Sequence, residues 1–353
     1  MAVKQIYQQV KEEIERDIEA YHAGRIQQLP SENRYAEILH VSRMTVRKAV
    51  EELIQEGRIV RIPGKGLAIP EASGSDDSLR HKLAFIIRYS PDDDFFSRTV
   101  LACSQVANEY GYGYSIYNIA SGQPADINVL DDVDGVLLTY YNEEHGDKLL
   151  AAARKAHIPV VCIDNIPLDN DVAYVLSDDV QGGYMAAKHL LEHGHRDILF
   201  IIDQQDEYSI NHRLTGYKMA MEEYGLSVDE HNIVRIDTKN DLELVLEQRL
   251  NESQPFTAIM SYTDEYVVEA YRVLRDMGID IPEQVSLVGY GDFMKGRLLE
   301  VPLTTIAMPT FDMGATACRM LIDYLEGRGP LGRMVLSVKL IERASVAQCS
   351  KSK

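Results

Sequence analysis

Apolar side chains recur every three or four positions through the first seventy residues, which is the spacing of amphipathic helices. The pattern predicts a first helix around 6–18, a second capped by Ser31 and a third that begins at Ser42 and ends at Gly57. Residues 58–69 then read as a tight hairpin with a basic tip. We therefore expect a small α+β domain of three helices and a hairpin.

From residue 82 onward, short apolar runs alternate with amphipathic stretches, as in chains that fold into parallel sheets covered by helices. The number of runs suits two consecutive wound sheets better than one. The strands expected are 83–87, 114–119, 135–138, 160–163, 198–202, 233–236, 258–260, 285–288 and 305–307. Helices are expected between most of them, for example at 180–193, 212–224, 265–277 and 311–325.

A run rich in Gly, Ser and Asp, without apolar periodicity, separates the two patterns. The sequence is thus expected to divide into a first domain over 1–70, a linker over 71–81, an α/β body over 82–345 and a C-terminal tail over 346–353.

The net charge of −19 is unevenly distributed along the chain. Residues 1–70 carry 11 basic and 10 acidic side chains, whereas the remaining residues carry 25 and 45. Within 34–65, seven basic residues accompany four acidic ones. The acidity therefore belongs to the body, and DNA binding by the first domain is compatible with the overall charge.

The sequence carries no signal for a membrane or for export. No stretch approaches eighteen consecutive apolar residues, so no membrane span is expected. The first residues lack the basic and apolar run of a signal peptide. The four cysteines show neither metal-site spacing nor a disulfide framework, which is typical of a reducing compartment. We therefore expect a cytoplasmic protein.

The third predicted helix has the composition of a DNA-reading helix. Its polar residues near the N-terminus and off the apolar stripe include Arg43, Thr45 and Arg47. A helix in the major groove places its N-terminal residues on base edges, where an Arg can grip guanine through two hydrogen bonds. Residues better suited to phosphates or a groove edge are Ser42, Gly64 and Lys65. The residues alone are equally compatible with the solvated basic face of a small helical adaptor.

Three segments, 29–33, 41–50 and 56–60, resemble the winged-helix signature of the GntR family. The resemblance covers nearly all of 5–69 and implies that double-stranded DNA is a partner. The DNA-contacting residues it implies are Ser42, Arg43, Met44 and Arg47 in the recognition helix, with Gly64 and Lys65 in the wing. Asn33 and Met44, which we place at the interface, stand where the family often has Arg and Thr. The operator sequence therefore does not follow from the resemblance.

The motifs of the body resemble the effector module of the lac-repressor (LacI/GalR) family, itself similar to periplasmic sugar-binding proteins. They run in family order at 177–184, 189–196, 213–217, 263–265, 278–282, 288–292 and 302–305. The resemblance implies two α/β lobes joined by three crossovers, with a small-molecule effector in the cleft between them. The fusion of the two modules is similar to arabinose-responsive repressors of Gram-positive bacteria.

The same resemblance implies which residues bind the effector. Arg213 and Asp264 match cleft positions that hydrogen-bond the ligand, and a donor with an acceptor suits a polyol. Phe95 and Phe96 follow the first strand, where an aromatic ring can pack on a sugar. Asp292 closes the Gly-Tyr-Gly-Asp motif. The alternative roles are a surface ion pair or helix cap for Arg213 and Asp264, and core packing for the two Phe residues.

Metal and cofactor chemistry find little support. His189 and His193 lie four residues apart on a predicted helix, with His195 close by, but no carboxylate or cysteine is spaced to complete a metal site. A Gly-Tyr-Gly run at 111–113 lacks the rest of a dinucleotide fingerprint, and there is no nucleophile elbow or Walker-type lysine. We expect no metal and no cofactor, and an enzyme remains the alternative hypothesis.

Together these features predict a homodimeric transcription regulator on a palindromic operator. It is expected to repress carbohydrate-utilisation genes until a small sugar such as arabinose releases it. Co-repression, and a scaffold that binds a protein in the cleft, stay open. Met308 stands where the family often has Gln, and Gly291 where it often has Asp, so the identity of the effector does not follow.

Overall fold

The computed structural model describes residues 10–11, 13–18, 29–55, 59–62, 66–68, 81–87, 94–118, 127–139, 143–164, 166, 172–204, 208–236, 239–251 and 256–349. Contacts divide the chain into two compact units, Met1–Ser78 (the front unit) and Leu79–Lys353 (the rear unit). Apart from His81, the expected linker 71–81 lies outside the described residues, so its boundaries stay a prediction.

The front unit contains the helices and the hairpin that the apolar spacing predicts. Residues 10–11 and 13–18 are helical, α2 spans Glu32–Ile38 and α3 spans Arg43–Gln55. The hairpin pairs β1 (Val60–Ile62) antiparallel with β2 (Gly66–Ala68). The predicted helix end at Gly57 and the hairpin tip lie outside the described residues.

One apolar core holds the front unit together. A side-chain cap marks the beginning of α2, and a change of backbone direction follows its end. Ser31 caps α2 by accepting a hydrogen bond from the Arg34 backbone N–H. After α2 the chain turns at His40, whose φ is 52°. The Tyr35 hydroxyl donates to Asp17 at 2.9 Å. The buried core residues are Val10, Ile14, Ile18, Leu29, Tyr35, Val46, Ala49, Val50, Leu53, Ile59 and Leu67.

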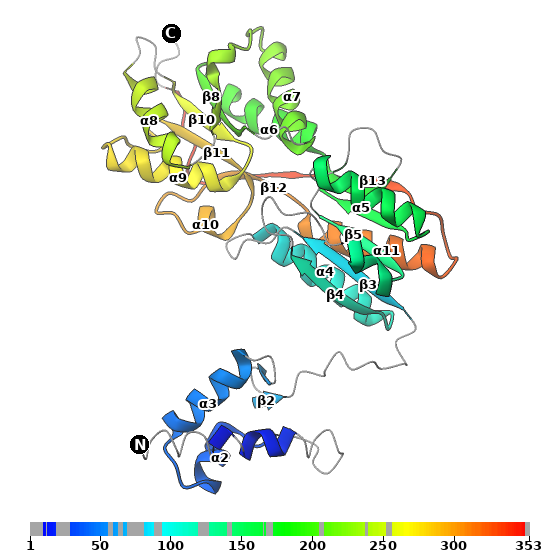
Figure 1. Ribbon diagram of the computed structural model, residues 1–353. Coiled ribbons are helices and arrows are strands. Elements are labelled where there is room, and N and C mark those ends of the chain that lie inside the picture. The colour runs from blue at the N-terminus through cyan, green and yellow to red at the C-terminus, as the bar shows by residue number, and fades with distance from the viewer. Residues whose placement is uncertain are drawn as a thin grey trace. The chain divides into compact units, whose positions relative to one another are not determined.

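The rear unit is built on two six-stranded sheets (Figure 1). The first has the order β13-β7-β6-β5-β3-β4 and is parallel throughout. Its strands are β3 (Lys82–Ile87), β4 (Gly113–Asn118), β5 (Gly135–Leu138), β6 (Val160–Ile163), β7 (Ala173–Ser177) and β13 (Arg333–Leu336). We call this sheet and its helices the first lobe.

The second sheet has the order β14-β12-β11-β10-β8-β9, and only the pair β12–β14 is antiparallel. Its strands are β8 (Ile198–Asp203), β9 (Ile233–Ile236), β10 (Ala258–Ser261), β11 (Ser286–Gly291), β12 (Thr304–Ala307) and β14 (Lys339–Ile341). We call this sheet and its helices the second lobe.

Helices cover both faces of each sheet. In the first lobe α4 (Asp94–Glu109) and α11 (Thr310–Leu325) pack on one face, and α5 (Glu143–Lys155) with the 3-10 helix η1 (Ile127–Asp132) packs on the other. In the second lobe α6 (Asp179–Glu192) and α7 (Tyr208–Glu223) cover one face, and α8 (Lys239–Leu250) and α9 (Asp264–Asp276) the other. The short elements η2 (Glu230–Asn232) and α10 (Met294–Arg297) complete the second lobe.

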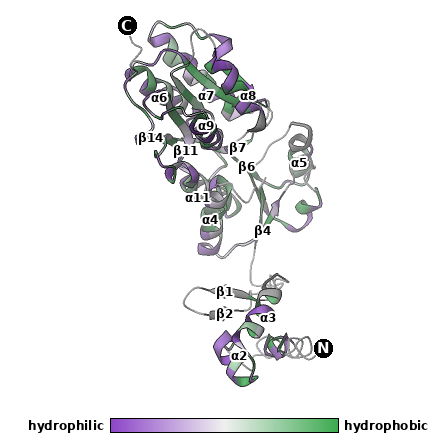
Figure 2. Cartoon of the chain, turned by 90° about the vertical axis from the view of Figure 1, so that its left-hand side faces the viewer, coloured by the Kyte–Doolittle hydropathy of each residue, from purple (hydrophilic) through white to green (hydrophobic). Residues whose placement is uncertain are grey.

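Burial of both faces explains why the strands read as apolar runs. In β3 and β5, Phe85 and Leu137 belong to the core beneath α4 and α11, while their neighbours Ala84 and Val136 belong to the core beneath α5. In Figure 2 hydrophobic residues (green) gather in the interior of the rear unit, and hydrophilic residues (purple) are frequent along its outer helices. The two-lobed α/β architecture expected from the sequence is therefore confirmed.

The chain crosses between the lobes three times, as expected. The first crossover runs from β7 to α6 through residue 178, the second from β12 to α11 through 308–309, and the third from β13 to β14 through 337–338. The nine strands predicted for the rear unit are present with small shifts at their ends. The strands that the sequence did not predict, β7, β13 and β14, are those that flank the first and third crossovers.

Within the part of the chain that the structure describes, no helix is long and apolar enough to cross a bilayer. The four cysteines, Cys103, Cys162, Cys318 and Cys349, are all free thiols.

Candidate DNA interface and effector site

The helix α3 separates a buried apolar face from an exposed polar one. Val46 and Val50 are fully buried in the core of the front unit. Arg43, Met44 and Arg47 are exposed, and the Met44 side chain has 72% of its surface in solvent. The predicted contact residues of this helix therefore lie on its accessible face, which is the arrangement a base-reading helix requires.

Ser42 and Thr45 fix the start of α3. The Ser42 hydroxyl accepts from the Thr45 backbone N–H at 3.2 Å and shares a 2.8 Å hydrogen bond with the Thr45 hydroxyl. This cap fixes the first turn of the helix, and backbone N–H groups at a helix N-terminus favour a phosphate. Asn33 is exposed in the first turn of α2, and Gly64 and Lys65 lie outside the described residues.

In the second lobe, Arg213 forms a buried ion pair. Its Nε donates to Asp179 Oδ1 at 2.8 Å, with the two side chains 7% and 1% exposed. Its guanidinium stacks 3.8 Å from the centre of the Tyr290 ring. Nη1 donates to the Tyr262 carbonyl at 2.6 Å, and Nη2 lies 3.7 Å from the Met308 sulfur. Arg213 on α7 thus reaches the carboxyl ends of β10, β11 and β12 and is no surface ion pair.

Asp264 lies at the N-terminus of α9 but does not cap that helix. Its carboxylate, 1% exposed as a residue, accepts from the Thr305 hydroxyl at 2.6 Å and from the Phe293 backbone N–H at 2.7 Å. Burial raises the pKa of Asp264 from 3.8 to about 6, and the hydrogen bonds from Thr305 and Phe293 only partly oppose this shift. The side chain is therefore held on β12 and on the turn after β11.

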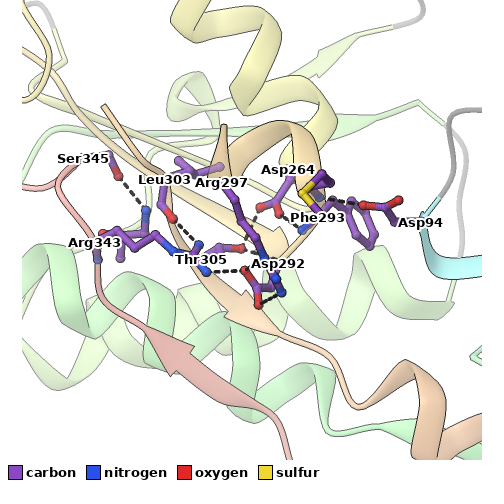
Figure 3. A network of polar contacts seen from close by, with 11 residues as sticks. Asp94, Asp264, Asp292, Phe293, Arg297, Leu303, Thr305, Arg343 and Ser345 are labelled. Atoms are coloured by element: carbon purple, nitrogen blue, oxygen red, sulfur yellow. Dashed lines mark hydrogen bonds and ion pairs between the residues drawn. The ribbon is translucent and has the colours of Figure 1, made fainter. Parts of the chain in front are cut away.

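Asp292 is the centre of an arginine clamp at the end of β11 (Figure 3). Arg297 donates to both carboxylate oxygens, with Nε–Oδ1 at 2.9 Å, and Arg343 Nη2 donates to Oδ1 at 2.5 Å. The Asp292 N–H lies 3.4 Å from the Thr305 hydroxyl oxygen, which connects the clamp to Asp264. Gly291 has a φ of 126°, and a side chain there would collide with the Phe293 ring.

The aromatic pair at the start of α4 is mainly core. Phe95 is buried in the large apolar cluster, and Phe96 packs edge-on against it at 5.2 Å between ring centroids. The preceding residue, Asp94, contacts the second lobe, because its Oδ2 accepts from the Met294 N–H at 2.6 Å. Figure 3 shows Asp94 approaching the turn at Phe293. The start of α4 therefore adjoins the Asp264–Asp292 network.

Two family models match the chain. Residues 6–69 match "Bacterial regulatory proteins, gntR family", and residues 187–346 match "Periplasmic binding protein-like domain". The HTH-type transcriptional repressor PurR of Escherichia coli is 30% identical over 271 residues, which are 74% of this chain and 79% of the relative. The chain belongs to the HTH-type transcriptional regulators.

Some similar proteins match this regulator over nearly its whole length, through both the front and the rear unit. The arabinose metabolism transcriptional repressor of Geobacillus stearothermophilus is 27% identical over 358 residues, covering 97% of this chain and 98% of the relative. The solved complex of the transcriptional regulator CelR with cellobiose has a TM-score of 0.68 and 25% identity, and covers 90% of this chain and all of that one. The expected fusion of a GntR-type domain with a LacI-type module is confirmed.

Sequence reasoning missed several partners of the expected effector residues. Asp179 pairs with Arg213, Thr305 bonds Asp264, and Arg343 clamps Asp292. Asp179 and Thr305 lie inside the quoted motifs at 177–184 and 302–305 but carried no assigned role. A buried Arg and a buried Asp each require a partner of opposite charge or a hydrogen-bond partner. This requirement could have directed attention to the polar residues of the same motifs.

The three histidines of the 189–195 segment have structural contacts. The His193 ring nitrogen Nδ1 bonds the His189 carbonyl at 2.8 Å. His195 bonds the Thr257 hydroxyl at 3.0 Å and the Ala347 carbonyl at 3.1 Å, so residues expected to form the tail contact the second lobe. Over the described ranges, no group of three or more His, Cys, Asp or Glu is arranged to hold a metal ion.

Gly289→Ala is expected to displace the Asp264 carboxylate. A Cβ at residue 289 in β11 would lie 2.0 Å from Asp264 Oδ1 and 2.7 Å from a Leu303 methyl. We expect a loss of stability of about 1–3 kcal/mol and loss of effector binding, measured by thermal denaturation and calorimetry. Gly329→Ala is the control, because nothing lies within 4 Å of its Cβ. Equal behaviour of the two variants would contradict the placement of Asp264.

Asp264 is also expected to make stability depend on pH. Its folded pKa of about 6 lies above the ordinary 3.8, so its favourable contribution is complete below about pH 4 and lost as the pH rises through 6. Between pH 4 and pH 8 the unfolding free energy of the parent should fall relative to that of Asp264→Asn by about 2–3 kcal/mol. Urea denaturation at each pH measures this difference, and a constant difference would show that the Asp264 pKa is not raised.

Proposed function

We propose that the regulator represses carbohydrate-utilisation genes by binding operator DNA through α3, and that a small sugar bound in the rear unit releases it. The observation that carries the proposal is the match to an arabinose repressor across 97% of this chain, through both units. The exposed basic start of α3 and the buried polar groups of the second lobe supply the chemistry for the two binding events.

Arg43 and Arg47 are the residues we assign to base edges, with Met44 and Thr45 beside them. Ser42, Asn33, Gly64 and Lys65 are assigned to the phosphate backbone or groove edge. The assignment rests on the exposed face of α3 and on the cap that orients its first turn. Arg is the residue that reads guanine most often, through paired hydrogen bonds to O6 and N7.

The effector site is assigned to the carboxyl ends of β10, β11 and β12, where ligands of parallel α/β sheets bind. Arg213 offers donors, and Asp264 and Asp292 offer acceptors, which is the set that hydroxyl groups require. Phe96, half-buried at the start of α4, supplies an apolar surface next to Phe95. Arabinose and cellobiose, which the names of two similar proteins mention, are polyols of this kind.

The crossovers are the segments through which we propose that effector binding changes operator affinity. Asp179 follows the first crossover, Met308 lies in the second, and Arg343 follows β14 after the third. A ligand that changes the contacts of these residues changes the relative free energies of the lobe arrangements. It can alter operator affinity only by its differential affinity for those arrangements.

We further propose that the regulator acts as a homodimer on a palindromic operator, because two-fold symmetric proteins match two-fold symmetric sites. It acts in the cytoplasm, where bacterial DNA lies. Its action is binding rather than catalysis, in keeping with relatives that are transcriptional regulators.

Arg43→Ala is expected to weaken binding to a specific DNA site by about 1–3 kcal/mol, the contribution of one two-bond base contact. Effector affinity should stay unchanged. Fluorescence anisotropy with a duplex selected from random sequences by the parent protein measures the first quantity, and calorimetry the second. Arg16→Ala is the matched control, since Arg16 is exposed in the first helix and paired with Glu13.

The comparison also needs a random duplex, because non-specific binding depends mainly on phosphate contacts. Arg43→Ala should reduce the ratio of specific to random affinity, and Arg16→Ala should leave that ratio as in the parent. If the two variants reduced the ratio equally, α3 would not be the element that reads the sequence.

A further inference from the structure

The buried Arg213–Asp179 ion pair, taken as a whole, carries no net charge. Burial alone lowers the pKa of Arg213, but Asp179, Tyr290 and Asp164 outweigh it, so the net shift is upward and the group stays charged. Its charge is therefore balanced by Asp179 at 2.8 Å. An anionic ligand at Arg213 would have to compete with this carboxylate.

The two carboxylate oxygens of Asp179 differ in their hydrogen bonds. Oδ1 accepts from Arg213, from the Tyr290 hydroxyl at 2.9 Å and from the Ser177 hydroxyl at 3.1 Å. Oδ2 is buried and has no hydrogen-bond partner in the part of the chain that the structure describes. A buried acceptor without a donor is unfavourable, and a hydroxyl from a ligand would relieve it.

Arg213 has a matching donor. Two of its nitrogens are held by oxygens, those of Asp179 and the Tyr262 carbonyl, whereas the hydrogen-bond partner of Nη2 among the described residues is the Met308 sulfur at 3.7 Å. A thioether sulfur is a weak acceptor, so a ligand oxygen can replace it. The ion pair thus presents one weakly held donor and one unpartnered acceptor, which fits the oxygens of a polyol.

The neighbouring cations are already paired. Arg297 and Arg343 both bind Asp292, and Asp264 adds a carboxyl group beside them. On the first lobe, Asp94 reaches the same turn. In this network the three carboxyl groups of Asp94, Asp264 and Asp292 outnumber the two guanidinium groups, so a phosphate or carboxylate placed beside it would meet net repulsion.

We propose that Asp179 determines the charge class of the effector: by neutralising Arg213 and offering Oδ2 to a hydroxyl, it selects an uncharged polyol over a sugar phosphate or sugar acid. The inference rests on the proposed function, since it concerns the effector site of that function. It assigns to Asp179 a role in specificity that the sequence motifs did not carry.

The first experiment uses the parent protein and matched pairs of probes. Calorimetry compares L-arabinose, D-ribose, D-glucose and cellobiose with D-ribose 5-phosphate, D-glucose 6-phosphate and D-gluconate. We expect at least one neutral sugar to bind about 100-fold more tightly than any of the anions. An anion that binds as tightly as the best neutral sugar overturns the inference. If no neutral sugar and no anion binds, the proposed function itself has failed.

The second experiment reverses the preference. Asp179→Asn removes the carboxylate that contacts Arg213 and raises the net charge of the site by one, so affinity for the neutral sugar should fall about tenfold and affinity for the phosphates should rise about tenfold. Tyr290→Phe is the control, because it removes one hydrogen bond to the same Asp179 oxygen without changing charge. Its ratio of neutral to anionic affinity should equal that of the parent.

Circular dichroism and a thermal melt establish that each variant is folded. A folded Asp179→Asn protein that keeps the parent's ratio overturns the role of Asp179, even though neutral sugars still bind the parent. A ratio that changes equally in Tyr290→Phe does the same, because the effect would then follow the hydrogen bond and not the charge. If Asp179→Asn does not fold, the parent's own ratio decides.

Discussion

The rear unit depends on one constraint: the charged side chains buried at the carboxyl ends of its parallel strands must all have partners. A charged side chain removed from water needs partners, and here each partner comes from a different element. Asp264 is held by β12 and by the turn after β11, Asp292 by Arg297 and Arg343, and Arg213 by Asp179 on α6. The second sheet therefore ends in a polar layer whose members fix one another's positions.

Under the proposed function, the position of this layer links a bound sugar to the arrangement of the lobes. The second crossover leaves β12 and the third enters β14 at the same end of this antiparallel pair, and the first crossover leads into α6 directly before Asp179. Asp94 of the first lobe adds a contact to the turn at Met294. A ligand that exchanges hydrogen bonds within the layer alters the segments that set the lobe arrangement. Packed interfaces of this kind switch between discrete states rather than deform continuously.

Much of the architecture could be predicted from the sequence, because the relevant signals are local. The apolar stripe of α3 and the runs of β3, β8 and β11 are visible within a few residues. The sequence did not predict β7, β13 and β14, and for the last two the reason is local. β13 is largely exposed, so its residues show no burial pattern, and β14 has only three residues. Their positions follow from pairing with strands distant in the chain, which the sequence alone does not display.

The difference between local signals and long-range pairing also applies to the candidate effector site. The family motifs predicted that Arg213, Asp264 and Asp292 belong to the effector site. The structure adds the residues that each of them contacts. Asp179 and Arg213 are 34 residues apart, Thr305 and Asp264 are 41 apart, and Arg343 and Asp292 are 51 apart. No local spacing reveals such pairs. On the front unit, exposure of Arg43, Met44 and Arg47 followed from helical periodicity, whereas the base sequence they read depends on atoms of the DNA itself.

The central claim is that the two units share one free-energy coupling, and reciprocity tests it most directly. The measurement is the calorimetric affinity for the effector sugar, taken once with the free protein and once with the protein saturated by its operator duplex. The account predicts that operator DNA weakens sugar binding by the same factor by which the sugar weakens operator binding. Equal sugar affinity in both states would contradict it.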